Sequence, residues 1–181
     1  MLTQLTILHL LGLIDLRYAD ESAFNLQPNI PYGWIKEGEQ REIHSQKGGN
    51  LNVFSLLNIQ GNLTSYQTTQ NVNALQIIDW LEDFKTKIEL PTVVVMDNAP
   101  WHTAQAVDDK LAEWENQGLY IYKLPPYCPH LNLAETLWRK IKCEWLKPED
   151  FLSKEALHLA INNILTNYNN EKFCIDFSIN I

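Results

Sequence analysis

The stretch TVVVMDN, residues 92–98, places three consecutive valines before Met96 and then turns polar at Asp97 and Asn98. β-Branched residues favour extended backbone, and a continuous apolar run of this length is typical of a strand buried on both faces. In open α/β sheets, functional groups gather at the carboxyl ends of such strands. We therefore expect a central strand that delivers Asp97 to the edge of a sheet.

Asp97 has two interpretations at this point. Asp and Asn both favour turns, so Asp97 with Asn98 can simply end the strand in an Asx turn. The same position also suits a metal ligand or a catalytic carboxylate. The stretch alone does not separate these two roles.

The rest of the chain alternates between strand and helix patterns. Apolar residues at every second position predict strands, and apolar residues three or four apart predict amphipathic helices. In residues 71–88, for example, Leu75, Ile78, Leu81 and Phe84 recur at helical spacing. The expected strands are residues 12–20, 34–38, 41–46, 51–59, 61–69 (with its turn) and 119–124, and the expected helices are residues 71–88, 103–118, 132–146 and 153–169.

These patterns indicate the α/β fold class. An antiparallel set of strands followed by strand–helix–strand crossovers builds a mixed sheet with helices on both faces. A length of 181 residues suits one domain with a real core, so we expect a single domain over residues 1–181. The apolar residues 1–16 are interpreted as structure or as a lead-in. They lack a basic region and are shorter than the roughly 18 apolar residues of a membrane span, so no membrane partner is expected.

Charge and cysteine content narrow the function. The chain has 14 Lys and Arg against 22 Asp and Glu, a formal net charge of −8. Stand-alone nucleic-acid-binding proteins are usually basic, so a role on DNA requires basic residues gathered on one face or another domain or subunit. Three widely spaced cysteines argue against a disulfide framework and favour a reducing, cytoplasmic location.

Glu135 also has two interpretations. Asn132 followed three residues later by Glu135 resembles a capping box, in which the acid accepts a hydrogen bond from the backbone at the helix start. Read alone, this favours a helix cap. Glu135 also shares a helix face with Trp138, Arg139 and Lys142, where the two cations can neutralise it or contact phosphates beside it.

Asp20, followed by Glu21, stands at the predicted end of the strand at residues 12–20, where a solvated loop entry is the plain alternative. Carboxylates from two strand ends and a helix start can converge on one or two Mg²⁺ or Mn²⁺ ions, which prefer hard oxygen ligands. Two such ions about 3.5–4 Å apart can activate a water or 3′-hydroxyl and stabilise the leaving oxygen of a phosphodiester. Asp20, Asp97 and Glu135 are the candidates.

Three blocks of sequence carry a family resemblance. They are YADESAFNLQPNIPYGWIKEG at residues 18–38, VVVMDNAPWHTA at residues 93–104 and LPPYCPHLNLAETLWRKIK at residues 124–142. In this order they resemble the three acidic blocks of DDE transposase catalytic domains, in the mariner-like branch of bacterial insertion sequences. Cys128 stands where that family usually has Ser, and residues 133–134 where it usually has Pro-Ile; neither change removes a ligand.

The resemblance implies an RNase H-like fold with Asp20, Asp97 and Glu135 as catalytic residues and ligands of two Mg²⁺ (or Mn²⁺) ions. It implies cleavage of DNA at transposon ends, followed by strand transfer to target DNA at a TA dinucleotide. DNA is then the main partner, a homodimer is allowed, and the location is the bacterial cytoplasm.

The family carries N-terminal helix-turn-helix modules, whereas only about a dozen residues precede the first predicted strand here. We therefore expect a separate or missing DNA-recognition module. The alternative function is a truncated, non-catalytic transposase remnant or accessory protein that retains the fold. Residues near the acids are expected to contact DNA or support the site: Glu21, Asn98, His102, Lys123, Tyr127, Asn132, Arg139 and Lys142.

Overall fold

A five-stranded mixed sheet forms the centre of the protein, in the order β3-β2-β1-β4-β5. The structure is a computed structural model that describes residues 1–27, 48–99, 105–126 and 128–177. Neighbouring strands among β1, β2 and β3 are antiparallel, whereas β4 runs parallel to β1 and to β5. The predicted mixed sheet is confirmed. The strands are β1 Asp15–Phe24, β2 Leu51–Leu57, β3 Leu63–Thr68, β4 Thr92–Met96 and β5 Leu119–Lys123.

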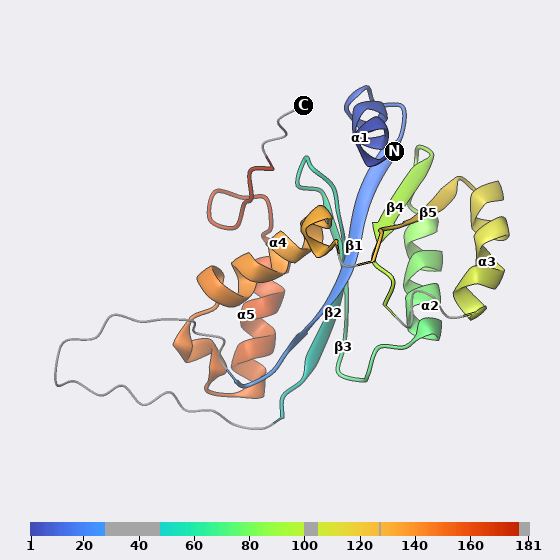
Figure 1. The fold of residues 1–181 in the computed structure, drawn as a ribbon. Coiled ribbons are helices and arrows are strands. Elements are labelled where there is room, and N and C mark those ends of the chain that lie inside the picture. Colours follow the sequence, from blue (N-terminus) through green and yellow to red (C-terminus); the bar gives the residue numbers. More distant parts are fainter. Residues whose placement is uncertain (28–47, 100–104, 127, 178–181) are drawn as a thin grey trace.

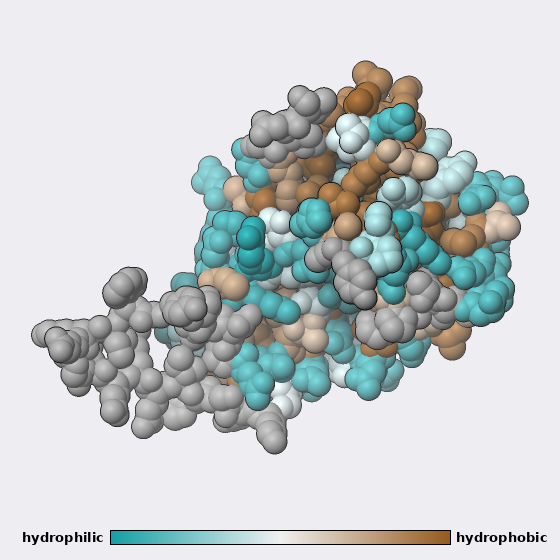
Figure 2. All heavy atoms as spheres, viewed as in Figure 1, coloured by the Kyte–Doolittle hydropathy of each residue, from teal (hydrophilic) through white to brown (hydrophobic). Residues whose placement is uncertain are grey.

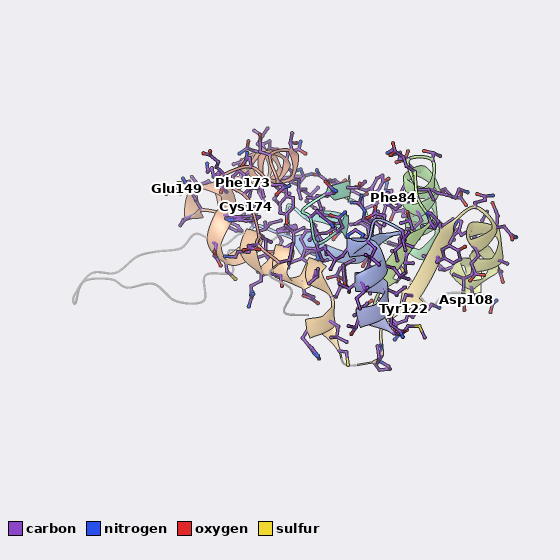
Figure 3. All side chains as sticks on the ribbon, turned by 90° about the horizontal axis from the view of Figure 1, so that it is seen from above. Phe84, Asp108, Tyr122, Glu149, Phe173 and Cys174 are labelled. Atoms are coloured by element: carbon purple, nitrogen blue, oxygen red, sulfur yellow. The ribbon has the colours of Figure 1, made fainter. Side chains whose placement is uncertain are left out.

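Helices cover both faces of this sheet, as predicted (Figure 1). Helices α4 and α5 lie on one face, and α2 and α3 lie on the other (Figure 3). The α-helices are α1 Leu2–Leu10, α2 Ala74–Lys85, α3 Gln105–Asn116, α4 Leu133–Lys140 and α5 Lys154–Thr166. Shorter helical turns are η1 Pro129–Leu131, η2 Ile141–Trp145 and η3 Pro148–Phe151.

Each face of the sheet has its own hydrophobic core. On the α4 and α5 face, Phe24 and Val53 pack with Leu137 and Ile161. On the α2 and α3 face, the members include Phe54, Leu56, Leu81, Val94 and Trp114. The two sets alternate along β2, with Val53 on one side and Phe54 on the other, which is the period of two expected of a strand buried on both faces. All five residues of β4 are buried, so the prediction for residues 92–96 is confirmed.

The first strand is longer than its pattern predicts. We expected it to end at Asp20, but β1 continues to Phe24. Its antiparallel pairing with β2 extends through Glu21↔Phe54 to Phe24↔Leu51, so neighbouring backbone satisfies the hydrogen bonds beyond the acids. The parallel neighbour β4 ends earlier, at Met96. Asp20 is therefore inside a strand, yet it lies at the level where the parallel part of the sheet ends.

Two helices depart from their predictions. In α2 the N-cap Asn73 accepts a hydrogen bond from the Gln76 N–H, and Leu75 of the predicted apolar stripe is 66% exposed. Ile77, two residues later, is fully buried in the core on the α2 and α3 face. The helix predicted for residues 132–146 changes period after Lys140, where η2 is a π-helical turn.

The N-terminal stretch forms helix α1, and the side chain of His9 attaches it to the sheet. The His9 ring is 7% exposed; its Nδ1 accepts from the Leu16 N–H at 3.1 Å and its Nε2 lies 2.5 Å from Gln60 Oε1. Apolar side chains gather over α1 on the face seen in Figure 2. In the described ranges, no helix is long and apolar enough to cross a membrane. The strands predicted at residues 34–38 and 41–46 lie outside the described residues.

Helix α5 offers a direct test of the core on its face of the sheet. Leu157 is fully buried among the α4 and α5 face residues, whereas Leu159 on the same helix is 69% exposed. Leu157→Ala should lower the free energy of unfolding by about 2–5 kcal/mol, because it removes buried methyl groups and leaves a cavity. Leu159→Ala, the matched control, should change it by less than about 0.5 kcal/mol. Urea unfolding measures both, and equal effects would contradict this packing.

Candidate active site

The sheet register brings Asp20 and Asp97 to the same level. Strands β1 and β4 pair from Asp15↔Thr92 to Tyr18↔Val95, and continuing that register by two residues places Asp20 beside Asp97. Tyr18 and Val95 belong to one cluster on one face of the sheet. Because strand side chains alternate between faces, Asp20 and Asp97 belong to this face as well.

Asn132 places the start of helix α4 over that face. Its carboxamide oxygen accepts from the Ala134 N–H at 3.1 Å, and its amide donates to the Ala19 carbonyl at 2.9 Å. Asn132 is 3% exposed, so both bonds are shielded from water. The residue before Asp20 is thus bonded to the residue that begins the Glu135 helix.

The capping prediction is confirmed for Asn132, the N-cap of α4. Within the described residues, no hydrogen bond joins the Glu135 carboxylate to the Asn132 N–H, so the reciprocal half of a capping box is not formed. Glu135 lies in the first turn of α4 and is exposed. Its carboxylate is therefore not held by the cap and can serve the site.

Electrostatics show that the acids are close to one another. The pKa of Asp20 is raised to about 7, first by burial and then by repulsion from Glu135, Glu21 and Asp97, against a smaller lowering by the Glu21 backbone N–H. Glu135 and Asp97 can contribute only because their carboxylates lie near Asp20. The three predicted acids thus come together, with Glu21 as a further negative neighbour.

The donor set of this site suits a divalent cation. Three carboxylates offer hard oxygen ligands of the kind that Mg²⁺ and Mn²⁺ prefer, and a cation would remove the repulsion that raises the pKa of Asp20. In the described part of the chain, no three such side chains are already close enough to hold one ion. An ion would therefore have to draw the carboxylates inward by side-chain rotation.

Asp97 forms the turn that was one of the two roles considered for it. Its Oδ1 accepts from the Ala99 N–H at 3.0 Å, which is the predicted Asx turn. Asn98 donates from its amide to the Leu124 carbonyl at 2.6 Å and so fastens the end of β4 to the segment after β5. Asn98 therefore supports the turn that carries Asp97, in line with the supporting role expected of it.

The predicted cations separate into two groups. Lys142 lies near Asp20 and Glu135, which act to raise its pKa, although burial lowers it more. Arg139 is exposed on the same helix. Lys123 is not part of this group, because its ammonium pairs with Asp108 of α3 at 2.7 Å, on the opposite face of the sheet (Figure 3). The expectation that Lys123 faces phosphates beside Glu135 is not supported by this pairing.

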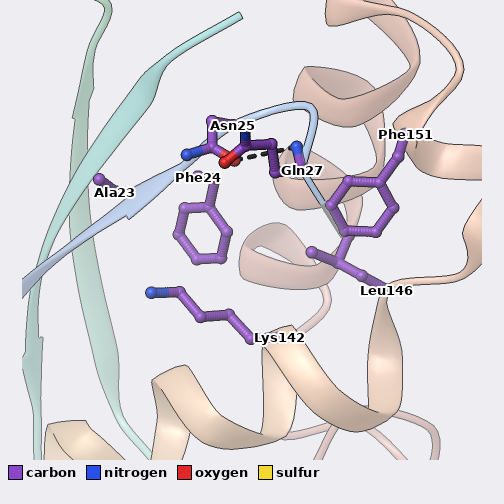
Figure 4. A pocket seen from close by; sticks show the side chains of 7 residues that line it. All are labelled: Ala23, Phe24, Asn25, Gln27, Lys142, Leu146 and Phe151. Carbon is purple, nitrogen blue, oxygen red and sulfur yellow. Dashed lines mark hydrogen bonds between the residues drawn. The ribbon is translucent and has the colours of Figure 1, made fainter. Parts of the chain in front are cut away.

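A cavity of about 320 Å³ adjoins Lys142 (Figure 4). The Lys142 ammonium lies 5.3 Å from the centre of the Phe24 ring, so the cavity has a cationic and an aromatic wall. Its lining residues are Ala23, Phe24, Asn25, Gln27, Lys142, Leu146 and Phe151. It lies along β1 beyond Asp20, and Asp20, Asp97 and Glu135 are not among its lining residues.

Sequence reasoning missed two residues that contact or adjoin Asp20. The Trp138 Nε1 donates to Asp20 Oδ2 at 3.0 Å, a contact that was not predicted. Its position three residues after Glu135 was a usable signal, because residues at that spacing share a helix face. Ser55 pairs with Asp20 across β1 and β2, and no local pattern indicates it. His102 and Tyr127 lie outside the described residues.

The fold and the acids define the class first: an RNase H-like domain with carboxylates gathered where the central parallel strands end. The chain belongs to the DDE superfamily endonucleases, because that family's profile matches residues 15–158. It is thus a transposase- or integrase-like domain, and the expected family and fold are confirmed. No curated protein matches the sequence.

Solved structures agree with this fold. The Mos1 transposase paired-end complex with the left transposon end has a TM-score of 0.63 and 16% identity, covering 94% of this chain and 53% of that one. The Mos1 mariner paired-end complex with Mn has a TM-score of 0.59 and 18% identity, covering 91% and 51%. The Mos1 mariner catalytic domain has a TM-score of 0.52 and 16% identity, covering 91% and 75%. The chain spans about half the length of the transposases in the paired-end complexes.

The raised pKa of Asp20 predicts a specific pH dependence of stability. The pKa is about 7 in the folded protein against 3.8 ordinarily, so the folded state binds the proton more tightly between these values. The contribution of protonated Asp20 to the free energy of unfolding is fully present below about pH 4, and it is lost as the pH rises towards about 7. In metal-free buffer, the free energy of unfolding of wild type, measured with urea, should fall by roughly 2–4 kcal/mol relative to that of Asp20→Asn across this range. Parallel pH profiles for the two proteins would contradict the prediction.

The two bonds of Asn132 predict an unusually costly cap. Asn132→Ala should lower the free energy of unfolding by about 2–4 kcal/mol, since it removes a cap and a buried partner of the Ala19 carbonyl. Asn73→Ala is the matched control, because Asn73 caps α2 at an exposed site. It should cost only about 1 kcal/mol. Equal losses in urea unfolding would show that the bond to Ala19 contributes nothing.

Proposed function

We propose that this chain is the catalytic domain of a DNA transposase that cleaves phosphodiester bonds at transposon ends. The freed 3′-hydroxyl is then joined to target DNA, at TA dinucleotides. The observation that carries this proposal is the meeting of Asp20, Asp97 and Glu135 beside the end of β4 in a chain of the DDE endonuclease superfamily. Their mutual repulsion reduces stability unless a cation binds, which favours a functional over a structural reason for the cluster.

In this proposal Asp20, Asp97 and Glu135 hold two Mg²⁺ or Mn²⁺ ions. When bound, such ions activate the attacking oxygen and stabilise the leaving oxygen of a phosphodiester. Two Mos1 mariner paired-end complexes are described as containing Mn and Mg, respectively, which supports divalent metal use in this fold. The chain's own part is to hold the carboxylates on rigid elements: β1, the turn after β4, and the first turn of α4.

Other residues of the site act on DNA. Arg139 of α4 and Lys142 of η2 follow Glu135 along the chain, so they are placed to contact phosphates beside the scissile bond. The half-buried Lys142 lies near Asp20 and Glu135 and also lines the cavity next to Phe24. Asn132 does not touch DNA in this scheme. It holds the helix that carries Glu135 against the strand that carries Asp20.

DNA is the proposed partner, since the Mos1 neighbours are complexes with transposon-end DNA. The net charge of −8 disfavours tight DNA binding by this domain alone. We therefore propose that a helix-turn-helix module, separate from the residues seen here, supplies recognition of the transposon ends. A homodimer that pairs two ends is part of the same proposal.

Cleavage of DNA from the ends of the element that carries this gene tests the proposal. With Mg²⁺ or Mn²⁺, the chain supplied with its recognition module should cut at the transposon ends. Asp20→Asn, Asp97→Asn and Glu135→Gln should each lower the rate by at least about 100-fold, because each removes a charged metal ligand. Thermal unfolding of each variant checks that the fold is retained.

Asp108→Asn is the control, because Asp108 pairs with Lys123 on the other face of the sheet. It should leave the cleavage rate within a few-fold of wild type. If Asp97→Asn and Glu135→Gln cut as fast as wild type, the ligand assignment is wrong. If wild type binds transposon-end DNA but does not cut it, the non-catalytic accessory protein becomes the better description.

A further inference from the structure

The indole of Trp138 contacts one oxygen of Asp20. The Trp138 Nε1 lies 3.0 Å from Asp20 Oδ2, and an indole N–H can only donate a hydrogen bond. Trp138 is 4% exposed, so water does not compete for this bond. The bond is made to Oδ2, so this indole does not occupy Oδ1 of Asp20.

Packing fixes the direction of this indole. Its ring meets the Phe24 ring edge-on, with centroids 6.1 Å apart and planes at 73°. Leu137 of α4 and Ile141, the first residue of η2, are fully buried in the same cluster. The donor therefore comes from a rigid side chain on the helix that also carries Glu135, which lies one turn earlier. A hydrogen bond on such a support orients a carboxylate more strongly than one from a loop would.

A second donor lies beside Asp20 on its other side. Ser55 of β2 is directly opposite Asp20 in the antiparallel pairing and is fully buried. Its hydroxyl has no hydrogen-bond partner in the described part of the structure. Directly opposed residues have their Cβ atoms about 4.5–5.5 Å apart, so the rotatable hydroxyl is within reach of the Asp20 carboxylate. A buried hydroxyl without a partner destabilises the fold, and a metal-bound carboxylate would satisfy it.

We propose that Trp138 and Ser55 are positioning residues that hold the Asp20 carboxylate from two sides and present its Oδ1 to the divalent cation. This rests on the proposed function, in which Asp20 is a metal ligand. Neither residue touches metal or DNA. Trp138 couples the orientation of Asp20 to α4, so Asp20 and Glu135 are set by the same helix. Ser55 contributes after Asp20 has turned towards the ion.

Mn²⁺ binding to the full chain, measured by titration calorimetry without DNA, separates this role from simple packing. Trp138→Phe removes the N–H and keeps an aromatic ring, and Ser55→Ala removes only the hydroxyl. Trp138→Phe should weaken Mn²⁺ binding about 10-fold or more, the size typical of lost hydrogen bonds to a metal ligand. Ser55→Ala should weaken it by a smaller factor while leaving the metal-free protein at least as stable as wild type, because the unpaired hydroxyl is gone.

Trp114→Phe is the matched control. The Trp114 indole also donates to a carboxylate, Glu82 Oε1 at 2.9 Å, and is fully buried, but on the α2 and α3 face of the sheet. Both Trp variants should lose similar thermal stability, and only Trp138→Phe should bind Mn²⁺ more weakly. Equal Mn²⁺ affinity of the two Trp variants would overturn the positioning role.

Asp97→Asn distinguishes this failure from failure of the proposed function. If wild type binds Mn²⁺ and Asp97→Asn does not, the metal site stands, and an unchanged Trp138→Phe refutes the positioning role alone. If wild type and Asp97→Asn bind Mn²⁺ equally, or neither binds it, the metal site is refuted and the positioning role falls with it.

Discussion

The carboxamide of Asn132 is the contact on which the arrangement of the site depends. It joins residues 113 positions apart, because its amide donates to the Ala19 carbonyl while its oxygen caps helix α4. Few other side chains could do both, since this requires a donor and an acceptor on one short, rigid group. As Ala19 precedes Asp20 and Ala134 precedes Glu135, one buried side chain sets the distance between two of the acids. The indole of Trp138 adds a second link between the same helix and the same strand.

The clustered acids destabilise the folded protein. Burial and three neighbouring carboxylates raise the pKa of Asp20, which means that the folded state resists its ionisation. The hydrophobic cores on both faces of the sheet supply the stability that offsets this cost, and β4 is buried over its whole length. A stable sheet that carries a destabilising group of acids is typical of a site that is completed by its ligand.

Much of the fold was predictable because local patterns were consistent with it. The valine run of residues 92–96 and the cap Asn132 appear as predicted, and three of the four predicted apolar residues of α2 are buried. The failures occurred where a partner far away in sequence decides the outcome. β1 runs past Asp20 because β2 pairs with it. Leu75, at the start of α2, is 66% exposed, whereas Ile78 and Leu81 of the same stripe pack in the core. Helix α4 is followed directly by the π-helical turn η2, in which the Leu146 N–H donates to the Ile141 carbonyl. At this turn Trp145 packs against Phe173.

By itself the sequence determined the kinds of elements, their order, and which acids are the candidates for the chemistry, since periodicity and residue type are local properties. Only the tertiary structure decided how these acids meet. The pairing of β1 with β4 brings Asp20 level with Asp97, and the face of β5 turns Lys123 towards Asp108 instead of the acids. The fold also delivers the Trp138 N–H to Asp20. Strand register and helix placement depend on contacts between distant segments, and a shift of one residue would turn every side chain of a strand to the opposite face.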